Sequence, residues 1–335
     1  MKCTFCDIVS YSDGQGGRPV RFRQPAAILD EMESLYHVNG VRWFNFVDDI
    51  FTGINRLQKG WVEEISDGVL KRGMKIGMFC ESRVDDINRD MLVKFKAAGL
   101  RTIAMGVETG HNEALDRYKK GATREQNLRA IRLVQDLNIH YELFSILVDA
   151  DSTPASMLEN IEFFVGLGYL QQNDPVPFSV QAIAFRAYPF RHSGLYQEYR
   201  RRNILRERGF SISYELLDPA TQRVSNACGE LHARIGDALR RMLAFRYVTA
   251  IQAGNVRAAV LEKRFGNLFL QADLAFMRKL LGRLAEEPNV FDHWIQDLVT
   301  ETANKINAIS RTVPASDPES AKDDWRWNRG HVAAT

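Results

Sequence analysis

Two cysteines near the start of the chain have the spacing of a metal or redox site. Cys3 and Cys6 form a C-x-x-C pair, a pattern that occurs in redox loops, zinc knuckles and iron–sulfur sites. Zinc normally needs two further ligands at similar spacing, whereas Cys80 and Cys228 stand alone far along the chain. A thioredoxin-like motif would lie between a strand and a helix, but a glycine-rich stretch, residues 13–19, follows here. The pair alone therefore leaves an unpaired structural role open beside the chemical ones.

Charged side chains recur where predicted strands end. They are Asp48, Asp49, Glu81, Arg83, Glu108 and Asp149. In a βα barrel the carboxyl ends of the strands form the rim at which ligands bind. Any one of these residues could be a loop charge beside the start of a helix, but six such positions together favour a shared site.

Apolar runs alternate with amphipathic helical patterns over the first two-thirds of the chain. The strands are predicted at residues 41–47, 75–80, 102–107, 139–148 and 178–185, and helices are predicted to begin near Pro25, Asn55, Met91, Thr123 and Thr153. Alternating strands and helices pair in parallel through right-handed crossovers. With one more strand leading up to the cysteines, the prediction is an α/β fold, a partial (β/α)6 TIM-like barrel. No glycine-rich phosphate loop follows the first strand, which argues against a dinucleotide-binding fold.

The pattern changes after about residue 190. A charged helix is predicted over residues 198–208, with Arg200, Arg201 and Arg202 as a solvated face, and residues 225–309 have helical patterns throughout. We therefore expect three parts: a barrel core over residues 1–210, a mostly helical region over 211–312, and a disordered tail over 313–335. His232, His293 and Trp294 are expected to be packing or surface residues.

Composition limits the classes of function. The 335 residues are 45% hydrophobic and 26% charged with a net charge of +2, which gives no reason to expect a nucleic acid partner. No apolar run is long enough to span a membrane, and four cysteines are too few for a disulfide scaffold. These features predict a cytoplasmic protein.

The order of the motifs resembles the radical S-adenosylmethionine (SAM) superfamily, in the branch often fused to a cobalamin-binding domain. The similarity runs from Lys2 to about Gly209. It is carried by the segments KCTFCD (2–7), FVDDIFT (46–52), CESRVD (80–85), GVETG (106–110), LDRYKKGATREQ (115–126) and AYPFRHSGLYQEY (187–199).

The resemblance implies a cofactor set and a reaction. Three thiolates hold a four-iron four-sulfur (4Fe-4S) cluster, SAM chelates the open iron, and an electron cleaves SAM to a 5′-deoxyadenosyl radical that abstracts hydrogen from a C–H bond. It also implies a small-molecule substrate and an external electron donor that is flavodoxin- or ferredoxin-like. By the same resemblance Cys3 and Cys6 are cluster ligands, and SAM or the cavity is contacted by Phe5, Asp48, Glu81, Arg83, Glu108 and Thr109.

Two features depart from the family pattern. The first cysteine of the C-x-x-x-C-x-x-C loop should lie four positions before Cys3, outside this chain, so we expect either a longer protein or a catalytically inactive remnant or partner protein. No D-x-H-x-x-G cobalamin motif occurs in the sequence, so cobalamin, and with it cobalamin-dependent methylation, is expected only in a longer protein. A zinc or redox protein is a third alternative, which predicts bound zinc or a reversible disulfide.

Overall fold

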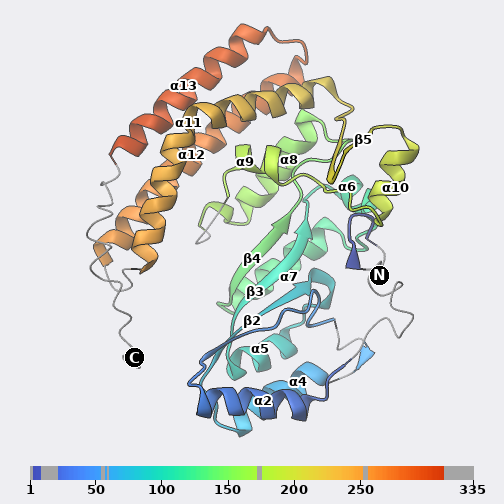
Figure 1. The fold of residues 1–335 in the computed structure, drawn as a ribbon, viewed down its shortest axis with the longest axis vertical. Coiled ribbons are helices and arrows are strands. Elements are labelled where there is room, and N and C mark those ends of the chain that lie inside the picture. Colours follow the sequence, from blue (N-terminus) through green and yellow to red (C-terminus); the bar gives the residue numbers. More distant parts are fainter. Residues whose placement is uncertain are drawn as a thin grey trace. The chain divides into compact units, whose positions relative to one another are not determined.

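Four apolar stretches of the sequence form one parallel sheet. In the computed structural model the strands are β1 (Trp43–Asn45), β2 (Gly77–Arg83), β3 (Leu100–Glu108) and β4 (His140–Ser145), in the order β1-β2-β3-β4 (Figure 1). Every neighbouring pair is parallel, which confirms the predicted crossover topology. A further parallel bridge joins Val148 to Arg186, beyond the end of β4.

The structure describes residues 3–8, 22–53, 57–58, 60–171, 176–251 and 256–312. The glycine-rich stretch at 13–19, the predicted helix start at Asn55 and the predicted tail at 313–335 lie outside these ranges. The chain divides into two compact units: the first is Met1–Asp174 with Ala184–Asp218, and the second is Pro175–Ile183 with Pro219–Thr335.

Helices connect the strands of the first unit. They are α2 (Pro25–Val38), α4 (Trp61–Lys71), α5 (Arg89–Ala98), α6 (Asn112–Arg117), α7 (Arg124–Asp136) and α8 (Pro154–Gly166), with short 3-10 turns at Val84–Asp86 and Tyr169–Gln171. The predicted capping box at Thr123 and Gln126 begins α7, and a second one at Thr153 begins α8. Capping side chains bind the free backbone N–H groups of the first turn, so these two starts could be predicted locally.

The two faces of the sheet have different surroundings. Met78 and Cys80 of β2 are fully buried, whereas Phe79 and Glu81, on the opposite face, are partly exposed. Helix α5 contacts β3 and α7 contacts β4. The apolar face is therefore the helix-covered one, and the other face carries the charged side chains toward the carboxyl ends of the strands.

The predicted charged helix over residues 198–208 is wrong in its second half. Helix α10 spans Gly194–Arg201, and the chain then forms a hairpin of β5 (Leu205–Arg208) and β6 (Ser211–Tyr214). Asn203 and Gly209 have φ angles of 56° and 62°, a left-handed conformation that ends the helix at the first and turns the hairpin at the second.

The predicted strand over residues 178–185 is also wrong, because residues Phe178–Ala184 form helix α9. Its buried positions include Phe178, Ser179 and Ala182, and a run of seven residues shows this helical spacing poorly in sequence. The buried carboxylate of Asp273 accepts the backbone N–H of Ser179, which caps the first turn. That cap comes from a residue 94 positions away, so no local pattern could reveal it.

Three long helices make up most of the second unit. They are α11 (Pro219–Ile251), α12 (Val256–Glu286) and α13 (Asp292–Arg311), each packed against the other two, which confirms the predicted helical region. Ser179 also donates its hydroxyl to Asp273, and His232 Nε2 lies 3.1 Å from the same hydroxyl oxygen. No helix among the described residues is long and apolar enough to cross a membrane.

Burial of Asp273 predicts a pH-dependent stability of the helical unit. Desolvation raises the pKa of this carboxyl to about 6 from an ordinary 3.8, so the folded protein binds the proton more tightly than the unfolded chain. The stability due to this group is present below pH 3.8 and is lost as pH rises through 6. Between pH 4 and pH 7, Asp273→Asn should remove on the order of 2–3 kcal/mol of this pH dependence, as measured by urea unfolding. Parallel pH profiles for the variant and the wild-type chain would contradict this account.

Candidate functional site

The loop with the two cysteines is held by backbone hydrogen bonds. The Cys6 N–H donates to the Cys3 carbonyl at 3.3 Å, which closes a turn, and the Thr4 N–H donates to the Tyr118 carbonyl at 2.8 Å. The Leu195 N–H donates to the Thr4 carbonyl at 2.6 Å. Both thiols are free and half-buried, and burial raises the pKa of the Cys6 thiol. The loop is therefore fixed on two sides before any ligand binds.

Arg83 connects this loop to the end of β2. Its Nη1 donates to the Cys3 sulfur at 3.4 Å, and its Nε forms an ion pair with Asp85 at 2.8 Å. Its Nη2 donates to the carbonyl of Lys120. The guanidinium is buried, and these partners fix its plane. The structure thus brings the predicted residues Arg83 and Cys3 together.

A buried ion pair lies beside the same loop. Lys120 Nζ is 2.6 Å from Glu108 Oε1, with side-chain exposures of only 5% and 8%. The Lys120 ammonium also lies 5.7 Å from the centre of the Phe5 ring, which packs edge-to-face on Tyr118. Lys120 was absent from the predicted site because lysines in such a segment are usually solvated. Only its contact with the buried Glu108, at the end of β3, identifies Lys120 as a residue of the site.

Glu108 has a strained backbone. Its φ of 65° is rare for a residue with a side chain and costs about 1–3 kcal/mol. Its carbonyl accepts the Ile146 N–H at 2.6 Å, and its carboxylate binds Lys120. Gly106 leaves room for this ion pair, because a Cβ at position 106 would be only 2.7 Å from Lys120 Nζ. Thr109, which follows Glu108, is buried, and its hydroxyl accepts the His111 N–H. This hydrogen bond shapes the turn after β3.

The acidic residues at the other strand ends are placed differently. Glu81 is partly exposed, and its pKa is raised first by burial and then by the charges of Asp49 and Glu142. Asp48 is exposed at the end of the β1 segment. Asp48 was the predicted cavity residue. The structure instead brings Asp49 near the site, where its negative charge adds to burial in raising the pKa of both Glu81 and Cys6.

Asp149 belongs to an internal network. Its carboxylate accepts hydrogen bonds at 2.9 Å from Arg117, from the Tyr118 hydroxyl and from the Ser152 hydroxyl. These bonds join the end of α6 to the loop after β4. The aspartate therefore supports the residues that hold the cysteine loop, and its oxygens are already engaged.

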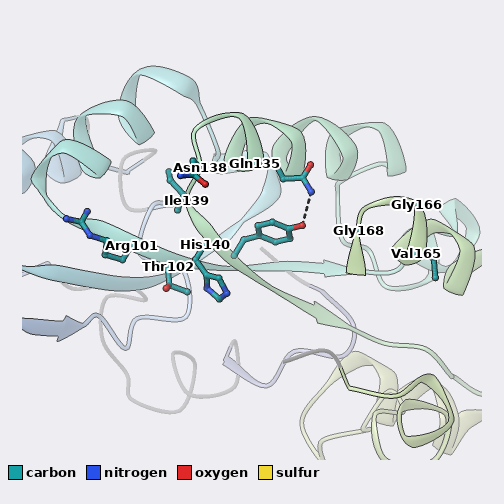
Figure 2. Close-up of a pocket in the computed structure, with 10 residues that line it drawn as sticks. Arg101, Thr102, Gln135, Asn138, Ile139, His140, Val165, Gly166 and Gly168 are labelled. Atoms are coloured by element: carbon teal, nitrogen blue, oxygen red, sulfur yellow. Dashed lines mark hydrogen bonds between the residues drawn. The ribbon is translucent and has the colours of Figure 1, made fainter. Parts of the chain in front are cut away.

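An open pocket of about 840 Å³ lies elsewhere, where β3 and β4 begin (Figure 2). Thr102 and His140 line it from the strands, and Gln135 donates to the hydroxyl of Tyr141 at 2.8 Å on its wall. The candidate site lies at the carboxyl ends of these strands, so the pocket is separate from it.

The ion pair gives a sharp test of the site's architecture. Lys120→Met removes the partner of a buried carboxylate and should lower the free energy of unfolding by about 3–5 kcal/mol. Lys120→Met combined with Glu108→Gln should recover most of that loss, because no uncompensated charge remains. Lys94→Met is the matched control, since Lys94 binds Asp67 at the same 2.6 Å on the surface and should change stability by less than about 1 kcal/mol. Equal losses for Lys94→Met and Lys120→Met, measured by chemical denaturation, would refute this account.

The packing under the ion pair gives a second test. Gly106→Ala places a methyl group against Lys120 Nζ and Glu108 Oε1 and should destabilise the protein by about 1–3 kcal/mol. Gly166→Ala is the control, because nothing lies within 4 Å of a Cβ at that position. Thermal unfolding of both variants checks the prediction, which fails if Gly106→Ala melts at the wild-type temperature.

Residues 1–164 match the family model described as the radical SAM superfamily. The chain is 31% identical over 198 residues to an anaerobic magnesium-protoporphyrin IX monomethyl ester cyclase of Rubrivivax gelatinosus, covering 58% of this chain and 32% of the cyclase. It is 30% identical over 178 residues to 4′-phospho-dehydrooxetanocin synthase of Priestia megaterium, covering 48% and 24% of the two proteins. The chain thus spans a third or less of the length of these two relatives.

A solved structure has the same fold. It is the cobalamin-dependent S-adenosylmethionine radical enzyme OxsB with aqua-cobalamin and S-adenosylmethionine bound, which superposes with a TM-score of 0.63 at 17% identity. The match covers 96% of this chain and 54% of that one.

Proposed function

The chain belongs to the radical SAM superfamily, and on that basis we propose that it binds a 4Fe-4S cluster and cleaves S-adenosylmethionine to activate a C–H bond of a small-molecule substrate. The observation that carries the proposal is the bond from Arg83 to the Cys3 sulfur. It places the cysteine loop against the carboxyl ends of β2 and β3, where Glu108 and Lys120 also lie. This geometry supports the proposal that the loop thiols and the strand-end charges belong to one site.

Cys3 and Cys6 are the residues that would hold the cluster. A cluster held there would supply the electron that breaks the sulfur–carbon bond of S-adenosylmethionine. The turn closed by the Cys6 N–H keeps both thiols on one loop, and Arg83 offers a positive charge to a thiolate at Cys3. Three thiolates are the usual set in this superfamily, and among the described residues no third His, Cys, Asp or Glu completes a metal-binding group.

The remaining residues would orient the cosubstrate. S-adenosylmethionine carries an ammonium and a carboxylate group, so the paired charges of Glu108 and Lys120 offer complementary partners for both. Phe5 packs on Tyr118 and presents an apolar surface beside this ion pair. Glu81 and Asp49 add negative charge at the ends of β2 and β1. Burial of Glu108 and Lys120 keeps water from screening them, which strengthens such contacts.

An external protein must supply the electron, and we propose a flavodoxin- or ferredoxin-like donor. Cobalamin-dependent methylation is supported by the resemblance of the ordered motifs to the cobalamin-linked branch.

Anaerobic reconstitution tests the cluster directly. The chain is incubated with iron, sulfide and a small thiol that can occupy a remaining coordination position, and bound iron, sulfide and 5′-deoxyadenosine are measured. We expect about four irons per chain, with a loss of most of this iron in Cys3→Ala and in Cys6→Ala. Cys80→Ala is the control, because Cys80 is fully buried in β2 and burial strongly raises the pKa of its thiol.

Four outcomes would contradict the proposal. Iron that binds equally well to the Cys3→Ala/Cys6→Ala double variant would show that the loop is not the ligand. Zinc bound in place of iron, or a reversible disulfide between Cys3 and Cys6, would favour the metal-structural or redox alternative. A reconstituted cluster without any 5′-deoxyadenosine would favour an inactive remnant or partner protein.

A further inference from the structure

A strongly basic surface adjoins the cysteine loop. We define the basic hairpin surface as residues 186–214, which comprise α10 and the hairpin of β5 and β6. This segment has seven arginines and two glutamates, a net charge of +5, whereas the whole chain has a net charge of +2. The rest of the chain is therefore net acidic, and positive charge gathers in this one segment.

Some of these arginines are neutralised within the protein. Ion pairs join Arg191 to Glu207, Arg201 to Glu198, Arg202 to Asp151 and Arg206 to Glu215. With Asp151 and Glu215 counted, the net charge of the surface is still +3. Arg200 and Arg208 are exposed and form no ion pair with any described residue. These two side chains are available to an acidic partner.

Exposed aromatic side chains lie among the arginines. Phe210, at the tip of the hairpin, is 101% exposed, and Tyr188 and Phe190 are each 44% exposed. Aromatic and arginine side chains are enriched at protein interfaces, and a fully exposed phenylalanine gains free energy when a partner covers it. Exposed aromatic and arginine side chains together favour the binding of a protein to this hairpin.

The basic hairpin surface is firmly attached to the cysteine loop. Leu195 and Tyr199 of α10 share one buried cluster with Ile204, and Phe5, Leu205 and Tyr214 pack against it. The Leu195 N–H also donates to the Thr4 carbonyl at 2.6 Å. Figure 1 shows α10 and β5 beside the N-terminal segment. A protein docked on the hairpin therefore lies next to the loop of Cys3 and Cys6.

We propose that the basic hairpin surface docks the acidic one-electron donor of this enzyme, an inference that rests on the proposed function. One electron leaves the reduced flavin or iron–sulfur centre of the donor, which is oxidised, and enters the cluster, which is reduced; no bond forms or breaks. The positive charge of the hairpin, which packs beside the loop, steers an acidic protein toward Cys3 and Cys6. A nucleic acid would be a poorer match, because four of the seven arginines are already bound to carboxylates.

The test is direct binding of a flavodoxin with a net negative charge, measured by isothermal titration calorimetry at low and at high salt. Arg200→Glu/Arg208→Glu should weaken binding about tenfold or more and reduce its salt dependence. Phe210→Ser should weaken binding at both salt concentrations, because it removes apolar contact. The matched control is Arg129→Glu/Arg132→Glu, two exposed arginines of α7 that form no ion pair with the described residues. It should change affinity less than about twofold.

Several results would overturn the proposal. Flavodoxin binding that survives Arg200→Glu/Arg208→Glu would place the donor elsewhere. Binding of single-stranded RNA, or of phosphatidylglycerol vesicles, with no binding of flavodoxin would assign the surface to another partner. Circular dichroism checks that the variants fold, which is expected because the replaced side chains are exposed.

The binding assay does not require a bound cluster, so it separates this inference from the proposed function. A chain that binds flavodoxin through Arg200 and Arg208 but never binds iron would contradict the proposed function alone. In reconstituted protein, Arg200→Glu/Arg208→Glu should slow cluster reduction by flavodoxin about tenfold and leave reduction by dithionite unchanged. Slowing by both reductants would mean that the variant damages the site itself and would overturn the docking proposal.

Discussion

The buried ammonium of Lys120 is the contact on which the candidate site depends. It neutralises Glu108 at the end of β3, lies near the ring of Phe5 and offers its backbone carbonyl to Arg83. A charge with so little exposure to water is stable only while its partner is in place. The left-handed backbone of Glu108 depends on the same contact, because the ion pair and the hydrogen bond from Ile146 hold Glu108 in that conformation.

Residues 117–120 connect otherwise separate strand ends. Arg117 and Tyr118 bind Asp149 after β4, and Lys120 binds Glu108 at the end of β3. The carbonyls of Arg117 and Tyr118 accept hydrogen bonds from Thr4 in the cysteine loop. The short connection between α6 and α7 therefore fixes the position of the cysteine loop relative to the sheet. The support for the cysteine loop is therefore built from buried, mutually satisfied polar groups.

Sequence patterns predicted the parallel α/β core and much of the site, because both have local signals. Strand ends with charged residues, capping boxes and the cysteine spacing are all readable over a few neighbouring positions. One error occurred where a distant residue decides the conformation, because helix α9 takes its cap from Asp273. The other has a local cause: left-handed turns at Asn203 and Gly209 end α10 and form the hairpin after it. The site role of Lys120 was not predicted, because its partner Glu108 is twelve positions away, at the end of the preceding strand.

From the sequence alone we predicted the resemblance to the radical SAM superfamily, the alternation of strands and helices over the first unit, and the pair of thiols proposed as cluster ligands. These follow from spacing and periodicity, which the chain carries locally. Only the tertiary structure decided that Lys120 pairs with Glu108, that Arg83 reaches Cys3, and that α10 packs beside the cysteine loop. Such pairings depend on burial and on the distance between side chains far apart in the chain. Those quantities exist only once the chain has folded.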